Sequence, residues 1–170
     1  MSLVGAVALA LLGGLGSAGL AQDDPTEPVG IVVTLSDFAH VAGGDWVDEA
    51  DKPYGTNYGQ EHSYTWEATD PRLSGAATYR GNWHGYGSLD SQLEGFEWSV
   101  VNDEGSWAGT GYGIFSVGAR FGDLASVVMH GAGAYEGLTA FLTFDIAHEE
   151  DTARGLIIAD EMPPFPEPTE

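Results

Sequence analysis

Cysteine is absent from the sequence. Disulfide bonds, thiolate nucleophiles and cysteine-based zinc sites are therefore excluded, and the fold must depend on its hydrophobic core. The chain has 170 residues, which is enough to bury such a core, and this length favours a single domain. The same absence removes the cysteine to which a bacterial lipoprotein attaches its lipid.

Basic residues are nearly as scarce. Five lysines and arginines stand against 26 aspartates and glutamates, which gives a net charge of −21. An anionic surface of this strength repels phosphate backbones, nucleotide phosphates and anionic lipid headgroups. We therefore expect no nucleic-acid partner, no docking on a membrane surface and no cofactor.

Helical periodicity is also missing. From residue 29 onward, apolar and polar residues alternate with a period of two, and Gly, Asn and Asp interrupt the alternation at short intervals. This pattern is typical of an antiparallel β-meander. The predicted strands are residues 29–36, 61–69, 74–82, 93–102, 107–116, 124–131, 138–146 and 155–160.

Short antiparallel strands joined by short turns can close on themselves, which removes exposed sheet edges. The sequence therefore predicts an all-β, eight-stranded antiparallel up-and-down barrel, with a β-sandwich as the alternative. One connection, residues 37–60, is long and rich in Gly, Asp and aromatic residues. Loops of this length in compact domains are usually functional or partly disordered.

The first 21 residues carry no charge and end in Gly19, Leu20 and Ala21. A short apolar segment followed by small residues is typical of a cleavable secretory signal peptide, although a buried or membrane-spanning helix is the alternative. We expect cleavage after Ala21, which predicts a secreted, periplasmic or cell-surface protein. After this segment, an acidic linker over residues 22–28, a β-barrel domain over residues 29–161 and a proline-rich tail over residues 162–170 are expected.

Side-chain parity divides each strand into an inner and an outer face, because alternate residues point in opposite directions. Tyr64 and Trp66 share a face that excludes Glu67. Phe96 and Trp98 share a face in the same way, and the reverse assignment would bury glutamate charge. The residues assigned to a ligand-binding interior are Tyr64, Trp66, Tyr79, Phe96, Trp98 and His130.

Two histidines have the parity of apparent inner residues. His62 alternates with Tyr64 and Trp66, and His130 alternates with Val128. Each could orient a ligand in an apolar cavity, or could bind a loop carbonyl at the rim of a barrel. The five histidines form no H-x-H or H-E-x-x-H spacing, so no transition-metal site is predicted.

The strand predicted at residues 107–116 carries glycine at every second position of its middle part. Gly109, Gly111 and Gly113 lie on the same side as Trp107 and Phe115. If this is the inner side, the glycines either leave room in the barrel or relieve strain where the sheet coils tightly. Both interpretations stay open at this point.

Catalytic residues are not assigned, because the serine-hydrolase pattern G-x-S-x-G does not occur in residues 22–170. Acidic residues cluster within the long connection, at Asp45, Asp48, Glu49 and Asp51, and again at residues 149–151. Carboxylates in flexible loops suit calcium, whereas a solvated charged loop is the plainer interpretation. No EF-hand pattern is present, and calcium binding stays open.

A glycine-rich hairpin carries a family resemblance. Residues 131–137 read GAGAYEG, which resembles the G-x-G-x-[FY]-x-G hairpin of allene oxide cyclase-like and dirigent-like barrels. Together with WAGTG at residues 107–111 and DPRLSG at residues 70–75, the chain also resembles a group of uncharacterised exported bacterial proteins. The resemblance implies an eight-stranded barrel with an apolar central cavity. It carries over no catalytic residue.

Three functions follow from these observations. The first is an exported, non-enzymatic barrel that binds a small, largely apolar molecule in its interior. The second is a cofactor-free cyclase or isomerase that uses the same cavity, and it additionally requires a carboxylate or histidine with a shifted pKa inside that cavity. The third is a structural or surface-interaction domain with a filled core.

Overall fold

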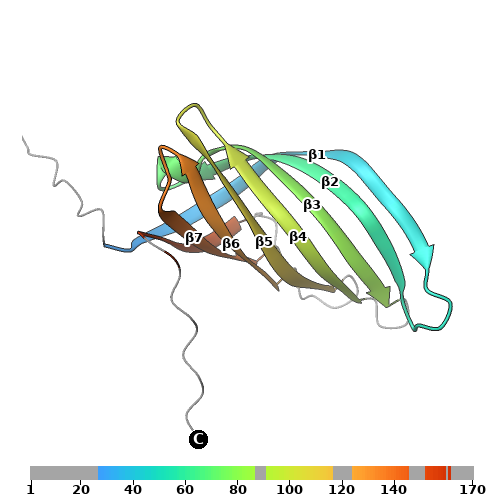
Figure 1. Cartoon of the computed structure of the whole chain (residues 1–170). Coiled ribbons are helices and arrows are strands. Elements are labelled where there is room, and N and C mark those ends of the chain that lie inside the picture. Colours follow the sequence, from blue (N-terminus) through green and yellow to red (C-terminus); the bar gives the residue numbers. More distant parts are fainter. Residues whose placement is uncertain (1–26, 87–90, 117–123, 146–151, 160, 162–170) are drawn as a thin grey trace, which may run out of the picture.

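The computed structural model describes residues 27–86, 91–116, 124–145, 152–159 and 161 (Figure 1). The predicted signal peptide and the proline-rich tail lie outside these residues, and so do residues 22–26 of the predicted linker and the acidic run at 149–151. Among the described residues, no helix has the length and apolar character needed to cross a membrane.

The predicted barrel is confirmed, and the sandwich alternative is wrong. Neighbouring strands pair antiparallel in sequence order, and the first strand also pairs with the last, which closes the sheet. The strands are β1 (Val29–Asp48), β2 (Gly55–Ala68), β3 (Gly75–Tyr86), β4 (Ser91–Val101), β5 (Gly105–Ser116), β6 (Leu124–Gly133), β7 (Leu138–Asp145) and β8 (Thr152–Ala159).

The predicted long connection at residues 37–60 is wrong, because most of it is strand. β1 continues to Asp48 and β2 begins at Gly55, so only a short turn separates them. The alternation is broken by register shifts in both strands, with positive φ angles at Asp37, Gly44 and Gly59. A bulge moves the following side chains to the opposite face, which removes the period-two signal from the sequence.

The barrel is closed only near the first part of β1. Residues Val29 to Thr34 pair with β8, and the rest of β1 pairs with β2 alone. As a result β1–β5 reach farther than β6 and β7 at the same end (Figure 1). The molecule is therefore a barrel that continues into an open, curved sheet.

The opposite end of the barrel is filled. Leu73 and Trp107 are fully buried there, and the indole Nε1 of Trp107 donates a hydrogen bond of 2.8 Å to the carbonyl oxygen of Arg72. The ring of Tyr135 stacks on Trp107 at a centroid distance of 5.5 Å. Arg72 and Leu73 belong to a short 3-10 helix (Pro71–Leu73) that joins β2 to β3.

The hairpins predicted from Asn, Asp and Gly are present. Asn102 Oδ1 accepts hydrogen bonds from the backbone amides of Glu104 and Gly105, each at 3.1 Å. In the GAGAYEG segment, Gly133 and Gly137 both have a positive φ, so the chain can turn there without the strain that a side chain would cause. Both turns lie at the filled end of the barrel.

Candidate functional site

A pocket of about 210 Å³ occupies the barrel interior on the side away from the filled end. We call it the lumen pocket. Its wall combines aromatic rings with a few polar groups, as is usual for sites that bind small molecules. It is lined by Gln60, His62, Tyr64, Tyr79, Gln92, Glu94, Phe96, Trp98, Phe115, Ala125 and Phe144.

The aromatic part of the wall is one continuous cluster. Trp98 stacks on Phe144 with a centroid distance of 5.8 Å and an interplanar angle of 10°. Its other neighbours include Tyr64 at 5.3 Å and Tyr79 at 5.5 Å. Because Tyr64, Tyr79, Phe96, Trp98 and Phe144 pack on one another, this part of the wall is largely formed before any ligand enters.

Glu94 is the acidic group of the lumen pocket. Its Oε2 accepts a hydrogen bond of 2.9 Å from the hydroxyl of Tyr79. Burial raises the pKa of the Glu94 carboxyl above its usual range, and the bond from Tyr79 opposes this rise. The carboxyl group is thus placed in a partly desolvated aromatic cavity, where its charge is costly.

His62 forms another polar part of the wall. Its ring stacks on Tyr79 at 5.5 Å, and its Nδ1 lies 3.2 Å from Nδ1 of His40 on β1. Burial lowers the pKa of His62, and the neighbouring His40 lowers it further. Both effects favour the uncharged imidazole of His62, which can exchange hydrogen bonds with a ligand but does not neutralise Glu94.

The glycines in the middle of β3 and β5 lie on the inner face, and the space that they leave is taken by neighbouring side chains or by the backbone of the adjacent strand. A Cβ atom on Gly81 would meet the ring of Tyr79, and one on Gly111 would meet the ring of Phe96. One on Gly113 would lie 2.7 Å from Oε1 of Glu94. The glycines therefore let large side chains of the same or an adjacent strand lie flat along the wall, and the lumen pocket is what remains.

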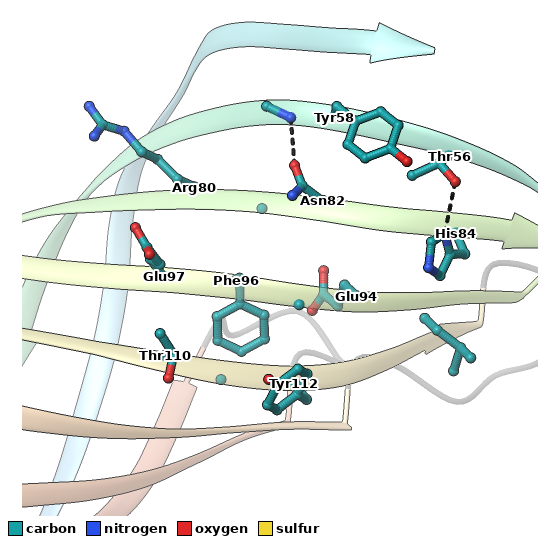
Figure 2. A pocket seen from close by; sticks show the side chains of 15 residues that line it. Thr56, Tyr58, Arg80, Asn82, His84, Glu94, Phe96, Glu97, Thr110 and Tyr112 are labelled. Atoms are coloured by element: carbon teal, nitrogen blue, oxygen red, sulfur yellow. Dashed lines mark hydrogen bonds between the residues drawn. The ribbon is translucent and has the colours of Figure 1, made fainter. Parts of the chain in front are cut away.

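A second hollow, of about 680 Å³, lies mainly on the outer face of β2–β5 (Figure 2). It passes over Gly95, which pairs with Asn82 on one side and Tyr112 on the other and has no side chain to fill the gap between them. Tyr112 is 78 % exposed and reaches over Gly95. Arg80 and Tyr112 of this groove are exposed, whereas Glu94 and Phe96 also line the lumen pocket.

Five of the six predicted site residues lie inside the barrel. Trp66 and Trp98 are 1 % and 4 % exposed, which confirms their inward parity. Trp66 lies beneath the lumen pocket, where it contacts Trp98 at 4.9 Å and Phe144 at 6.0 Å. The predicted residues that line the pocket itself are Tyr64, Tyr79, Phe96 and Trp98.

The inward assignment of His130 is wrong. Val127 and Met129 are the buried residues of β6, so His130 points outward, is exposed, and lies 3.3 Å from the hydroxyl of Thr139. The error has a physical cause. Val127 and Val128 are equally apolar, and the parity of this strand cannot be chosen from either residue alone.

Sequence reasoning missed the polar members of the wall. Glu94 and Gln92 have the same parity as Phe96 and Trp98, so the same alternation that placed the rings inside could have placed them there too. Neither residue was predicted, because a polar or charged residue near the end of an apolar alternation usually faces the solvent.

The acidic residues considered for calcium do not converge. Asp48 accepts a hydrogen bond of 2.7 Å from the indole of Trp46, and Glu49 accepts bonds from Thr56 and Tyr58 at 3.2 and 3.3 Å. In the described part of the chain, no three histidine, aspartate or glutamate side chains gather as metal ligands would. Nothing in this arrangement points to calcium.

Comparisons of the chain with protein-family models, with curated proteins and with solved structures give no match. The function is therefore inferred from the geometry of the lumen pocket.

Proposed function

We propose that the protein binds a small, largely apolar molecule in the lumen pocket. The observation that carries the proposal is a cavity of about 210 Å³ whose wall is a packed aromatic cluster, placed next to a filled barrel end. A cavity lined by rings gains affinity by removing apolar ligand surface from water, at roughly 25 cal/mol per Å². The expected export of the protein stays part of this proposal.

A second candidate function, cofactor-free isomerisation, is favoured by one observation. Glu94 combines a raised pKa with a position in the wall of the pocket, as a general base or acid requires. In such a reaction the carboxylate would take a proton from the carbon between a ligand carbonyl and a C=C double bond, which leaves a dienolate. It would then return the proton to the far carbon of that double bond, so that the double bond moves into conjugation with the carbonyl. Neither atoms nor electrons are needed from elsewhere.

Binding is tested with Nile red, a neutral dye that fluoresces in apolar surroundings. We expect saturable binding by the wild-type protein, and a loss of about tenfold or more in affinity when Ala125→Leu fills the pocket. Tyr64→Ala, which removes a half-buried ring from the wall, should also weaken binding. Tyr112→Ala removes an exposed ring from the outer groove and serves as the control.

The outcomes separate the candidate functions. Binding that is weakened by the two pocket variants and not by the control supports the proposal. If Tyr112→Ala alone weakens it, the dye occupies the outer groove, and the lumen proposal fails. Absence of any saturable binding favours a structural or surface-interaction domain.

The isomerase candidate is tested by NMR of 2-octanone in heavy water. An enzyme should speed exchange of the hydrogens next to the carbonyl, and Glu94→Gln should abolish the acceleration. Equal exchange rates with wild type, with Glu94→Gln and without protein would leave binding as the function.

A further inference from the structure

We propose that the lumen pocket selects a hydrophobic cation, meaning an apolar molecule with one ammonium group, and that the ammonium group binds Glu94. This inference rests on the proposed function and names the ligand class of the same site. It depends on the surroundings of Glu94, on the rings around it and on the charge of the whole chain.

The first observation is that one carboxylate oxygen of Glu94 is open to a donor from a ligand. Tyr79 occupies Oε2, and no described residue donates a hydrogen bond to Oε1, which faces the bare backbone of Gly113. No lysine or arginine is among the residues that line the pocket. A carboxylate in a desolvated cavity is stabilised most by a charged donor, and a cationic ligand can supply one here.

The arginine of the adjoining strand β3 is already engaged. Arg80 points to the outer face, where its Nε donates a hydrogen bond of 2.9 Å to Oε2 of Glu61. His62, the basic residue inside the pocket, has its pKa lowered by burial and by His40. At neutral pH the described residues therefore leave the charge of Glu94 without a cationic neighbour.

The second observation is the ring cluster around this carboxylate. Tyr79, which holds Glu94, lies 5.5 Å from Phe96 and 5.5 Å from Trp98, measured between ring centroids. Aromatic rings attract an ammonium group through their quadrupole, by roughly 0.5–2 kcal/mol, while they also bind its alkyl part. An acid set within aromatic rings is the combination that binds hydrophobic amines.

The charge of the whole chain points the same way. A net charge of −21 concentrates cations near the protein and repels fatty acids and other amphiphilic anions. A neutral alcohol is not repelled, but it can only offer Oε1 an uncharged hydrogen bond, which is about half as strong as a charged one. The expected order of affinity is amine, then alcohol, then carboxylic acid.

The experiment compares octylamine, octanol and octanoate as competitors of Nile red at physiological ionic strength. We expect octylamine to bind the wild-type protein about tenfold more tightly than octanol, a difference of about 1.4 kcal/mol, and octanoate to bind least. Glu94→Gln should lower the affinity for octylamine about tenfold and change that for octanol by less than about threefold.

Glu97→Gln is the matched control. It removes the same charge three positions along β4, at an exposed site on the outer face, and should leave the preference for octylamine unchanged. If Glu94→Gln and Glu97→Gln lower the affinity for octylamine to the same extent, the preference comes from the net charge. The assignment of the ammonium group to Glu94 is then overturned. If octanol binds as tightly as octylamine, the cation inference fails while the binding function stands. If none of the three compounds displaces the dye, the cation inference and the proposed binding function both fail.

Discussion

Glu94 shows how one side chain can be costly to the fold and useful to a site. Its carboxyl group lies among rings, accepts one hydrogen bond from Tyr79 and has its pKa raised by burial. In the ionised state it therefore loses more hydration than it recovers from the protein. Residues of this kind persist at sites where a ligand completes their interactions.

Burial of the Glu94 carboxyl group predicts how the stability of the protein depends on pH. Because its pKa is higher in the folded than in the unfolded protein, the folded state holds the proton more tightly, and stability is lost as the pH rises through the folded pKa. Below the pKa of the unfolded protein the carboxyl is neutral in both states. Glu94→Gln is never ionised, so it should be more stable than the wild type at about pH 7.5 and equal to it at about pH 4.

Urea midpoints of the two proteins at the two pH values measure this difference. Glu97→Gln changes the charge of an exposed residue of the same strand and should show no comparable gain at the higher pH. A gain by Glu94→Gln that is the same at both pH values would mean that packing, and not ionisation, is responsible.

Side-chain parity correctly placed the aromatic rings of the site inside the barrel, but it did not place the polar groups correctly. Individual residues explain the difference. Trp66 and Trp98 are flanked by polar neighbours, so only one face can be buried. In β6 the neighbours Val127 and Val128 are both apolar, and His130 was placed on the wrong face. Glu94 could be found only by giving alternation more weight than charge.

Among the elements, the β-meander could be predicted from the sequence, because the hairpins carry residues typical of turns. Asn102 with Gly105 and the GAGAYEG segment are examples, and all eight strands exist in the predicted order. The continuation of β1 to Asp48 and the early start of β2 at Gly55 could not be predicted from the sequence. Here the two strands are held by pairing across bulges, so the sequence resembles a glycine-rich loop although the backbone is bonded as sheet.

The turn between β6 and β7 gives a prediction at this scale. Gly133 has a φ of +71°, and a Cβ atom there would lie 3.1 Å from both the carbonyl oxygen of Glu104 and Cα of Gly105. Gly133→Val should therefore destabilise the domain by roughly 1–3 kcal/mol, because a branched side chain resists this conformation.

The control for this variant is Gly30→Val. Gly30 lies in β1, has no positive φ, and a Cβ atom there would have no neighbour within 4 Å. Its unfolding free energy should stay within about 0.5 kcal/mol of the wild type. If both variants unfold at the wild-type urea midpoint, the turn tolerates side chains and the backbone argument is wrong.

At the scale of the whole molecule, one end of the barrel is filled with side chains and the other end holds the lumen pocket. The filled end gathers Leu73, Trp107 and Tyr135 into a buried layer that stabilises the barrel. Because this layer stabilises the barrel, the other end can contain a pocket and a partly buried carboxylate, although both lower the stability of the fold. Sequence composition predicted an acidic barrel, but it could not predict how far along its axis the barrel is filled, because that depends on which rings lie over which glycines.

The charge of the whole molecule leads to the last prediction. A net charge of −21 is poorly compensated, since the ion pairs of the described residues are Arg72 with Asp70 and Arg80 with Glu61. Folding brings like charges together, and salt weakens their repulsion by shortening the screening length from about 30 Å at 0.01 M to about 8 Å at 0.15 M. The unfolding free energy should therefore rise with NaCl, and most steeply below about 0.2 M. Salt also strengthens apolar burial, but that effect grows steadily at higher concentration. Urea midpoints measured across this range distinguish the two, because a rise confined to molar salt would show that charge repulsion contributes little to the stability of this barrel.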